Sequence, residues 1–273
     1  MNFIRQYYFD FGVMSDNLSD LMAGFWITIK LSIFGGVLSL IWGLALAVIR
    51  QLPGRATAPL RWLSIGYIDA FRGIPLLIVL LLVSGGLSSL SSPIGGDVIP
   101  DFIGKPTWLG ETSPFWYGVI SLTITYGAYM AEVYRAGIEA VPNGQMEAAR
   151  SIGMSHGQAM RFVIVPQAVR KVIPPLLNDF IALMKDTSLV SILGLADVVY
   201  VGRQIQSDIF NGSGLVAGAI LFLIVTIPLA RLVDYLIARE QRRTKRSGES
   251  NDSDQLEETQ PAGGLPPNSG DLS

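Results

Sequence analysis

Residues 142–175 read PNGQMEAARSIGMSHGQAMRFVIVPQAVRKVIPP, a segment rich in Arg, Gln, Pro and Gly between strongly apolar stretches. Half of the 273 residues are hydrophobic and only 15% are charged, whereas soluble domains average about 25% charged residues. The composition therefore predicts an integral membrane protein. Residues 142–175 are too polar to cross a bilayer, so we expect them to lie outside it.

The apolar stretches on either side have the length of membrane spans, because a helix needs about 20 residues to cross the hydrocarbon. Five stretches qualify: Leu31–Ile49, Leu60–Val83, Thr112–Ala131, Leu176–Val199 and Ile209–Ala230. The fourth carries charges, and a four-span alternative leaves it as a re-entrant or buried segment. The predicted fold class is an all-α integral membrane protein with about five transmembrane helices.

Basic residues between the spans set the orientation, since cytoplasmic loops carry an excess of Lys and Arg. The loops on one side contain Arg50, Arg55, Arg61, Arg135, Arg150, Arg161, Arg170, Lys171, Arg239, Arg242, Arg243, Lys245 and Arg246; the other side contains Arg5, Lys105 and Arg203. We therefore expect the N-terminus outside, and the polar segment and C-terminus in the cytoplasm.

The chain ends differ from its apolar body. Residues 1–21 are aromatic and mildly acidic, which suits an interfacial segment at the membrane surface. All 20 Lys and Arg lie at or before Arg246, and the residues that follow are acidic and lack aromatic side chains. We predict a transmembrane domain over residues 22–240 and a disordered, acidic cytoplasmic tail over 241–273.

The polar segment has the signals of two short helices joined by a turn. Asn143 is placed to cap a first helix that begins near Gln145, and Gly153 stands where a helix ends in a left-handed turn. Ser155 and Gln158 form the pattern of a capping box that opens a second helix, which we expect to end at Pro166. The prediction is a helix–elbow–helix loop over about residues 139–175.

Here the sequence resembles a known family. EAARSIGMSHGQAMRFVIVPQA follows the EAA-loop pattern of bacterial ATP-binding-cassette (ABC) importer permeases, with Val163 and Val165 where Ile and Leu are usual. FRGIPLLIVL from Phe71, AYMAEVYRAGIEAVPNGQMEAA from Ala128 and PPLLNDFIALMKDTSLVSILG from Pro174 resemble the polar amino-acid branch, including the histidine, glutamine and arginine permeases. The resemblance runs from about Met22 to Arg239 and excludes the tail and much of the long outer loop.

The resemblance implies a multi-pass permease of the bacterial cytoplasmic (inner) membrane that imports polar amino acids. Its partners would be a second permease chain, the same or homologous, two cytoplasmic ATPase subunits and an extracytoplasmic substrate-binding protein. The chain would not be catalytic alone, and ATP and Mg would be bound by the ATPase. The implied ATPase-coupling residues are Glu147, Ala148, Ala149, Gly153 and Pro166.

Charges inside the fourth apolar stretch suggest a substrate pathway. Taking Pro175 as the start of this span places Asp186 about 16 Å along the helix, near the middle of the bilayer. A charge facing lipid there costs about 2.5–3.5 kcal/mol, so it should face protein or water. We predict that Asp186, Thr187 and Ser188 border the pathway and that Lys185 is a structural partner, with purely structural roles as the alternative.

Other functions fit the sequence less well. A self-sufficient secondary transporter or channel would also use charges within the membrane, but no inverted repeat is visible. A membrane enzyme or metalloprotein would need clustered catalytic or ligating side chains, whereas the chain has one His and no Cys, and no phosphate-loop motif. Asp69 with Arg72, and Glu132 with Arg135, are spaced as structural ion pairs along a helix, which is the interpretation we favour; a substrate site is the alternative for Asp69 and Arg72.

Overall fold

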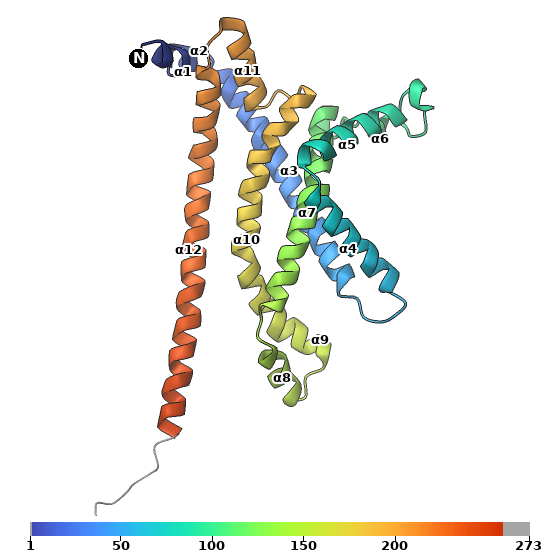
Figure 1. Ribbon diagram of the computed structural model, residues 1–273, viewed down its shortest axis with the longest axis vertical. Coiled ribbons are helices and arrows are strands. Elements are labelled where there is room, and N and C mark those ends of the chain that lie inside the picture. Colours follow the sequence, from blue (N-terminus) through green and yellow to red (C-terminus); the bar gives the residue numbers. More distant parts are fainter. Residues whose placement is uncertain (1, 259–273) are drawn as a thin grey trace, which may run out of the picture. The chain divides into compact units, whose positions relative to one another are not determined.

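The computed structural model describes residues 2–258; the side chains of residues 2, 3, 94, 240 and 242–258 are outside that description. Every regular element in this range is a helix (Figure 1): α1 (Asn2–Tyr8), α2 (Phe11–Asp16), α3 (Leu18–Arg50), α4 (Ala58–Gly73), α5 (Leu76–Leu90), η1 (Pro93–Gly95), α6 (Asp101–Gly104), η2 (Trp108–Gly110), α7 (Ser113–Glu139), α8 (Asn143–Ser151), α9 (His156–Ala159), the π-helix η3 (Met160–Ile164), α10 (Val165–Asp186), η4 (Thr187–Leu193), α11 (Val198–Ile209) and α12 (Ser213–Glu258).

Helix α7 is the centre of the core, and α3, α4, α5, α10 and η4 pack around it. Phe115 and Leu122 of α7 are fully buried against Leu31 of α3 and Leu183 of α10. Burying side chains of this size stabilises a fold by about 1.5–3 kcal/mol each where water is the alternative. Between helices in lipid, close packing and hydrogen bonds take over that role.

Small residues let α3 and α7 approach closely. A Cβ atom at Gly43 would lie 2.9 Å from the backbone oxygen of Gly127 and from the Cβ of Met130, which is closer than van der Waals contact allows. Nearby, the Ser39 hydroxyl donates to the backbone oxygen of Leu122 at 3.2 Å. Glycine contacts and interhelical hydrogen bonds of this kind are typical of helix packing in membranes.

Two helices in the described part of the chain are long and apolar enough to cross a membrane: Leu18–Arg50 and Ser213–Arg239. Helices α4 and α5 add a third candidate if together they form one span. Helix α7 is not among these candidates. It contains polar residues such as Ser121 and Thr125, which are buried against neighbouring helices. The outer surface of a bundle must be apolar, but a helix surrounded by protein need not be.

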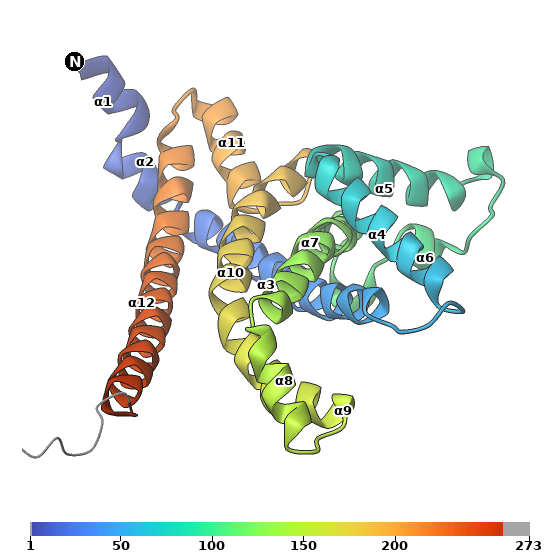
Figure 2. The same ribbon diagram turned by 60° about the horizontal axis from the view of Figure 1, so that its bottom comes forward.

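The second predicted span is not a single helix. Helix α4 ends at Gly73 and α5 begins at Leu76, with 109° between the two helices (Figure 2). Ile74 is extended (φ −94°, ψ 127°) because the ring of Pro75 disfavours helical backbone in the residue before it. The Tyr129 hydroxyl of α7 donates to the backbone oxygen of Arg72 at 3.2 Å, so part of the break is hydrogen-bonded to the core.

The fourth predicted span is also divided. Helix α10 begins at Val165 and contains Pro174 and Pro175 in its interior, so no helix begins at Pro175, and its role as the start of a membrane span stays a prediction. The helix ends at Asp186, where a 3-10 segment follows and closes at Gly194 with a left-handed φ of 81°. The apolar stretch Leu176–Val199 therefore folds as the end of α10, η4 and the start of α11.

The C-terminal part of the chain continues α12. The described part of the chain divides into two units after Val233, and this boundary falls within α12. Residues 241–258, which were expected to begin the disordered tail, are helical to Glu258. The remainder of that tail, 259–273, lies outside the described residues. The predicted domain limits and the interfacial role of residues 1–21 stay predictions.

Candidate functional site

The polar segment forms two short helices with a tight turn between them, as expected. Helix α8 ends at Ser151 and Gly153 takes a φ of +89°, in the left-handed region that favours glycine. The backbone N–H of Met154 donates to Ala149 at 3.2 Å, which closes the turn. A Cβ at Gly153 would meet no atom within 4 Å, so backbone conformation, and not crowding, requires glycine here.

The second helix of this loop opens with the predicted capping box. The backbone N–H of Gln158 donates to the Ser155 hydroxyl at 3.3 Å, and the backbone N–H of Ser155 donates to the Gln158 side chain at 2.8 Å. The first helix differs from the prediction. Asn143 is the first residue of α8 and not its cap, because the cap position is occupied by Pro142, which has no polar side chain to offer.

Replacing Ser155 with alanine should loosen the loop without unfolding the chain. An N-cap of this type contributes about 1 kcal/mol. We expect amide hydrogen exchange at Ala159 and Met160 to accelerate about fivefold, with exchange in α7 unchanged. Ser151→Ala is a suitable control, since its hydroxyl donates only to Ala148 within the same helix at 2.8 Å. Equal exchange in both variants would show that the capping box does not stabilise α9.

Beyond α9 the chain stays helical, which contradicts the predicted end at Pro166. The π-helix η3 leads directly into α10, and Pro166 occupies the first turn of α10, where a proline is tolerated. Residues 156–186 thus form one continuous helical rod about 45 Å long. Figures 1 and 2 both show α8 and α9 at one end of α10 and α11 at the other.

We name residues 142–166 the knob, and the surface of the knob is only partly the one expected. Glu147, Ala148 and Pro166 are exposed, whereas Ala149 is only 4% exposed and so packs inside the knob. A small side chain at 149 is therefore required by internal packing. The prediction that Ala149 forms a docking surface does not fit its burial.

Two apolar side chains on the knob were missed by the sequence reasoning. Ile152 is 76% exposed and Phe162 is 62% exposed, and the guanidinium of Arg161 lies 5.5 Å from the Phe162 ring centroid. Large apolar groups exposed on a part of the protein expected outside the bilayer mark an interaction surface. The available signal was the presence of bulky apolar residues at the ends of two helices in a polar segment.

At the other end of the rod, Asp186 lies in a cavity of about 440 Å³ between α10, α7 and the α4–α5 break. The lining residues are Arg72, Gly73, Ile74, Pro75, Leu76, Thr125, Tyr126, Tyr129, Asp179, Ala182 and Asp186. The Tyr126 hydroxyl donates to Oδ2 of Asp186 at 2.8 Å. The guanidinium of Arg72 lies 5.9 Å from the Tyr129 ring centroid.

Two polar atoms of this cavity lack a hydrogen-bond partner among the described residues. They are Oδ2 of Asp179 and Oγ1 of Thr125, and both are buried. A buried polar atom without a partner costs about 1–3 kcal/mol. Such atoms are explained where a ligand or water supplies the missing bond. One cationic group, two carboxylates and a hydroxyl without a partner therefore lie together around this cavity.

The other predicted pathway residues do not line this cavity. The Thr187 side chain is fully buried and its hydroxyl donates to Met184 at 2.7 Å. Ser188 lies on η4, beyond the end of α10, and its hydroxyl donates to the backbone oxygen of Lys185 at 2.7 Å. Lys185 is exposed and makes no ion pair with the residues that the structure describes. Only Asp186 of the three is brought to the cavity.

The two predicted ion pairs have opposite outcomes. Glu132 does pair with Arg135, whose Nε donates to it at 2.9 Å, and it also accepts from Arg50 of α3 at 2.9 Å. Asp69 and Arg72 do not pair within the described part of the chain, because Arg72 is turned toward Tyr129 and the cavity. Arg72 is thus a site residue that the spacing rule assigned wrongly.

Comparisons with known proteins agree with this architecture. A family profile described as "Binding-protein-dependent transport system inner membrane component" matches residues 39–242. The probable glutamine ABC transporter permease protein GlnM of Bacillus subtilis is 35% identical over 84% of this chain and 97% of its own length. The glutamate/aspartate import permease protein GltK of Escherichia coli O6:H1 is 31% identical over 85% and 99%.

A solved structure is similar over the same range. The crystal structure of an amino acid ABC transporter with histidines contains a chain that is 33% identical to this one, with a TM-score of 0.72. The match covers 84% of this chain and 98% of that chain. The chain therefore belongs to the family of binding-protein-dependent transport system inner membrane components.

Proposed function

We propose that this chain is the permease subunit of an ABC importer for polar amino acids. The observation that carries the proposal is the cavity of Arg72, Asp179 and Asp186, which lies at the end of the helical rod that starts at the knob. The relatives are named as glutamine, glutamate/aspartate and arginine permeases, which supports an amino acid as the cargo.

The cavity suits a zwitterion. The guanidinium of Arg72 matches an α-carboxylate, because its donors form the fork that binds carboxylates in pairs. Asp179 and Asp186 can accept from an α-ammonium group, and Tyr126 fixes the Asp186 carboxylate by donating to it at 2.8 Å. Thr125 adds a hydroxyl with an open hydrogen-bonding position. Bound substrate would then satisfy the two atoms that lack partners.

Five membrane spans are the arrangement that we propose for the body: α3, the bent pair of α4 and α5, α7, α10 and the apolar part of α12. The polar residues of α7 and one face of α10 contact protein, which supports both as inner spans of low apolarity. In this arrangement, α3 and the part of α12 between Ser213 and Arg239 would face lipid, because both are long and apolar enough to cross a membrane.

The knob is the proposed contact with the ATPase. Glu147, Ala148, Gly153, Ile152 and Phe162 are all exposed on the knob, which gives it polar and apolar groups suited to contact with a protein partner. In this proposal two permease chains, the same or homologous, stand over two ATPase subunits, and a soluble binding protein delivers the substrate. ATP and Mg belong to the ATPase, so the chain is not catalytic alone.

We expect a movement of the knob to be transmitted along residues 156–186 to the cavity. Gln167 of α10 donates to Gln145 of α8 at 3.0 Å, and Lys171 donates to the backbone oxygen of Ala140 at 2.6 Å. These bonds tie the base of α10 to the knob and to the end of α7. A displacement of the knob by the ATPase would therefore move α10, and with it Asp179 and Asp186.

We place the chain in the bacterial cytoplasmic membrane with its N-terminus outside and its C-terminus inside, on the basis of the distribution of Lys and Arg. The chain has no Cys, so single cysteines can be labelled without background. In intact cells, a membrane-impermeant maleimide should label Val98→Cys, in the long outer loop, and not Ser151→Cys on the knob. Both should react after the cells are opened. Labelling of Ser151→Cys in intact cells would reverse the orientation and remove the basis for the docking role.

The proposed substrate class is tested by ATP hydrolysis in the purified complex of permease, ATPase and binding protein. Each of the common amino acids is added in turn, with sugars and dipeptides as controls. We expect hydrolysis to rise several-fold with one polar amino acid or a small group of them. Equal rates with every compound would argue against amino-acid import.

A further inference from the structure

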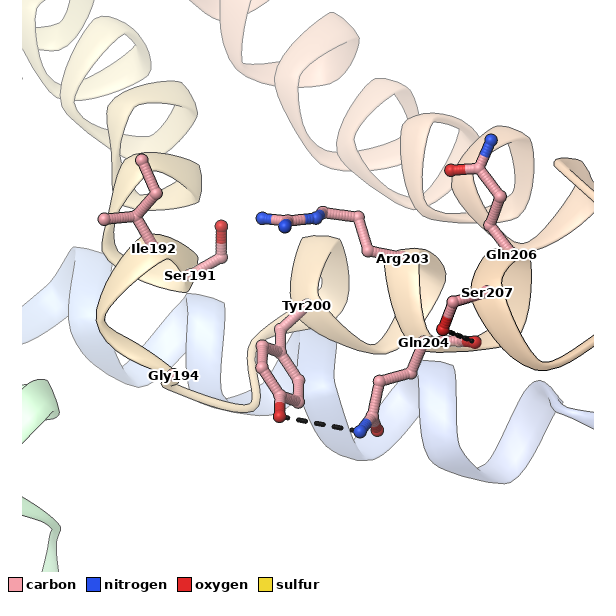
Figure 3. A pocket seen from close by; sticks show the side chains of 8 residues that line it. All are labelled: Ser191, Ile192, Gly194, Tyr200, Arg203, Gln204, Gln206 and Ser207. Atoms are coloured by element: carbon pink, nitrogen blue, oxygen red, sulfur yellow. Dashed lines mark hydrogen bonds between the residues drawn. The ribbon is translucent and has the colours of Figure 1, made fainter.

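An apolar groove of about 580 Å³ lies beside the knob, between the ends of α3 and α7 and the helices α9, η3 and α10. We name it the inner groove; it is lined by side chains from residues 44–53, 134–138 and 156–172. Its lining is apolar except for Gln51, Tyr134 and His156. The cavity between η4 and α11 differs, because polar side chains such as Arg203 and Gln206 make up most of its lining (Figure 3).

Several large apolar side chains of the inner groove are left open. Leu44 and Val48 of α3 and Val165 and Val169 of α10 all line it, and each is at least 40% exposed. Contact between water and so much apolar surface is unfavourable. The groove is therefore suited to an apolar occupant.

The polar side chains of the groove do not alter this character. The Gln51 side chain donates to the backbone oxygen of Ala47 at 3.4 Å, and the Tyr134 hydroxyl donates to the backbone oxygen of Leu40 at 3.4 Å. Both groups thus use their hydrogen bonds within the protein. A polar ligand would find few open partners inside the groove.

In the proposed orientation the groove lies at the cytoplasmic boundary of the bilayer. Helix α3 is apolar enough to cross a membrane and ends at Arg50. The groove extends along it from Leu44, before that end, to Pro53, beyond it. Its opposite wall includes His156 and Met160 of the knob, which we expect outside the hydrocarbon. The groove therefore connects the depth of the acyl chains with that of the headgroups.

The segments that line the groove are rich in positive charge. Residues 51–68 contain two Arg and no acid, and residues 148–178 contain four Arg or Lys and no acid. The carboxylates of α7 in this region, Glu132 and Glu139, are already paired with arginines. The cations of the two segments are Arg55, Arg61, Arg150, Arg161, Arg170 and Lys171. The surroundings of the groove thus favour an anion.

Arg61 is held at the edge of the groove. Its Nη1 donates to the backbone oxygen of Leu52 at 2.6 Å, and Leu52 lines the groove. Arg61 forms no ion pair in the described part of the chain. A guanidinium has five N–H donors, so others remain for a phosphate group, which arginine binds with paired hydrogen bonds.

We propose that the inner groove binds an anionic phospholipid of the inner leaflet, with an acyl chain against Val48 and Val169 and the phosphate at Arg61. Basic pockets between transmembrane helices on the cytoplasmic side have the chemistry that anionic headgroups require. The inference rests on the proposed orientation of the chain, because a reversed chain would present the groove to the outer leaflet. Bound lipid would join α3 to α9 and α10 and so steady the knob at the membrane.

Two other occupants fit the groove less well. A second copy of this chain packed through the same surface would bring identical cations together, because two-fold contacts are isologous. The residues after Arg246 carry acids that match the cations, but their large apolar side chains are limited to Leu256, Leu265 and Leu272, which form no apolar run. A phospholipid supplies both the apolar chain and the negative charge.

The test uses the complex of permease and ATPase in nanodiscs of phosphatidylcholine. A phosphatidylglycerol with a diazirine near the start of one acyl chain is added at increasing mole fraction, and crosslinked peptides are identified after illumination. We expect saturable crosslinks within residues 44–53 and 165–172. Phosphatidylcholine with the same diazirine should need a roughly tenfold higher mole fraction, because its choline group brings positive charge to a basic site.

A pair of tryptophan variants tests the position of the acyl chain. Val48→Trp should fill the groove and remove most crosslinks to residues 165–172. Val37→Trp is the matched control. Both valines are exposed on α3 and lie eleven residues apart, about three helical turns, so they share one face. Val37 does not line the groove, so its replacement should leave crosslinking unchanged.

Charge variants test the headgroup. Arg61→Gln should reduce the preference for phosphatidylglycerol over phosphatidylcholine, and Arg61→Lys should retain more of it, because it keeps the charge but loses the paired donors. Arg5→Gln, which removes an exposed cation on α1, should keep the wild-type preference. Co-purification with the ATPase checks that each variant is folded.

Several results would overturn the lipid site. They are equal crosslinking by the two lipids, an unchanged preference in Arg61→Gln, and equal losses in Val48→Trp and Val37→Trp. Crosslinks that appear only after truncation at Arg246 would assign the groove to the tail of the chain. No crosslinks in either the full or the truncated chain would assign it to a protein partner.

Failure of the lipid site is separable from failure of the proposed function. Labelling of Ser151→Cys and amino-acid uptake are measured with the same chain. If both behave as expected and the groove is not crosslinked, the importer proposal stands and only the lipid site fails. If Ser151→Cys is labelled from outside in intact cells, the orientation fails, and the lipid inference fails with it.

Discussion

Replacing Gly153 with valine is expected to uncouple the transporter: the chain should insert normally but lose most of its ATP-driven uptake. The φ of Gly153 is +89°, and a side-chained residue in the left-handed region costs about 1–2 kcal/mol. A β-branched residue is a stronger outlier there. In Gly153→Val we expect this strain to be relieved by a change in the angle between α8 and α9. That change would misplace the surface that we assign to the ATPase.

The effect on uptake should be larger than the strain energy alone suggests. A small change in the angle between α8 and α9 is enough to prevent the knob from fitting the ATPase. We expect uptake by Gly153→Val to fall at least tenfold, with weaker co-purification of the ATPase. Gly153→Asn should retain more activity, since asparagine tolerates left-handed backbone better than other residues. Substrate binding in the cavity of Asp186 should be unaffected, because it lies at the far end of the rod.

Two other glycines of the knob provide matched controls. Gly144 and Gly157 lie in α8 and α9 without a positive φ, and a Cβ at either would meet no atom within 4 Å. Alanine at these positions should preserve or slightly raise stability, by up to about 1 kcal/mol. If Gly153→Val transports normally, or if Gly144→Ala fails equally, the elbow is not the feature on which coupling depends.

Removing charge from the cavity is expected to abolish uptake while the complex still assembles. Asp186→Asn keeps the shape of the side chain and its ability to accept from the Tyr126 hydroxyl, but it removes the negative charge. Arg72→Gln removes the one cation among the described residues that line the cavity. A hydrogen bond to a charged group contributes about 1.5–3 kcal/mol, so each change should reduce substrate affinity roughly 10- to 100-fold.

The control for this pair is Asp69→Asn. Asp69 lies three residues from Arg72 on α4, is exposed and does not line the cavity. It should keep wild-type uptake. Assembly with the ATPase and hydrolysis without substrate are measured alongside. Failure of Asp186→Asn to assemble would favour a purely structural role for Asp186, as would normal uptake by an assembled Asp186→Asn complex.

Local signals in the sequence were sufficient for the turn of the knob and for the cap of its second helix, but not for the cap of its first helix or for the end at Pro166. The capping box of Ser155 and Gln158 and the left-handed turn at Gly153 depend on a few neighbouring residues, and both are present. The break at Pro75 follows from equally local chemistry, but a long apolar stretch concealed it. Pro174 and Pro175 misled in the opposite way, because α10 accommodates both of them in its interior.

The cavity could not be predicted in the same way, since its residues come from four helices, α4, α5, α7 and α10, and from the break between α4 and α5. The spacing predicted an ion pair between Arg72 and Asp69. In the structure the Arg72 guanidinium lies over the ring of Tyr129 instead, and the Tyr129 hydroxyl donates to the backbone oxygen of Arg72. Asp179 lies seven residues before Asp186, so both lie on one face of α10. That period was a usable signal, whereas Thr187 and Ser188 were chosen by adjacency and lie on η4. The burial of Ala149 also depends on tertiary packing.

The most direct test of the account is amino-acid uptake into proteoliposomes that contain this chain. The vesicles are prepared with and without the ATPase, with ATP inside or outside, and with binding protein and labelled amino acid added outside. We predict uptake only when the ATPase and ATP are present on the knob side of the membrane, and its loss in Gly153→Val. Uptake by the chain alone, driven by a proton or sodium gradient and independent of ATP, would contradict the account and identify a secondary transporter.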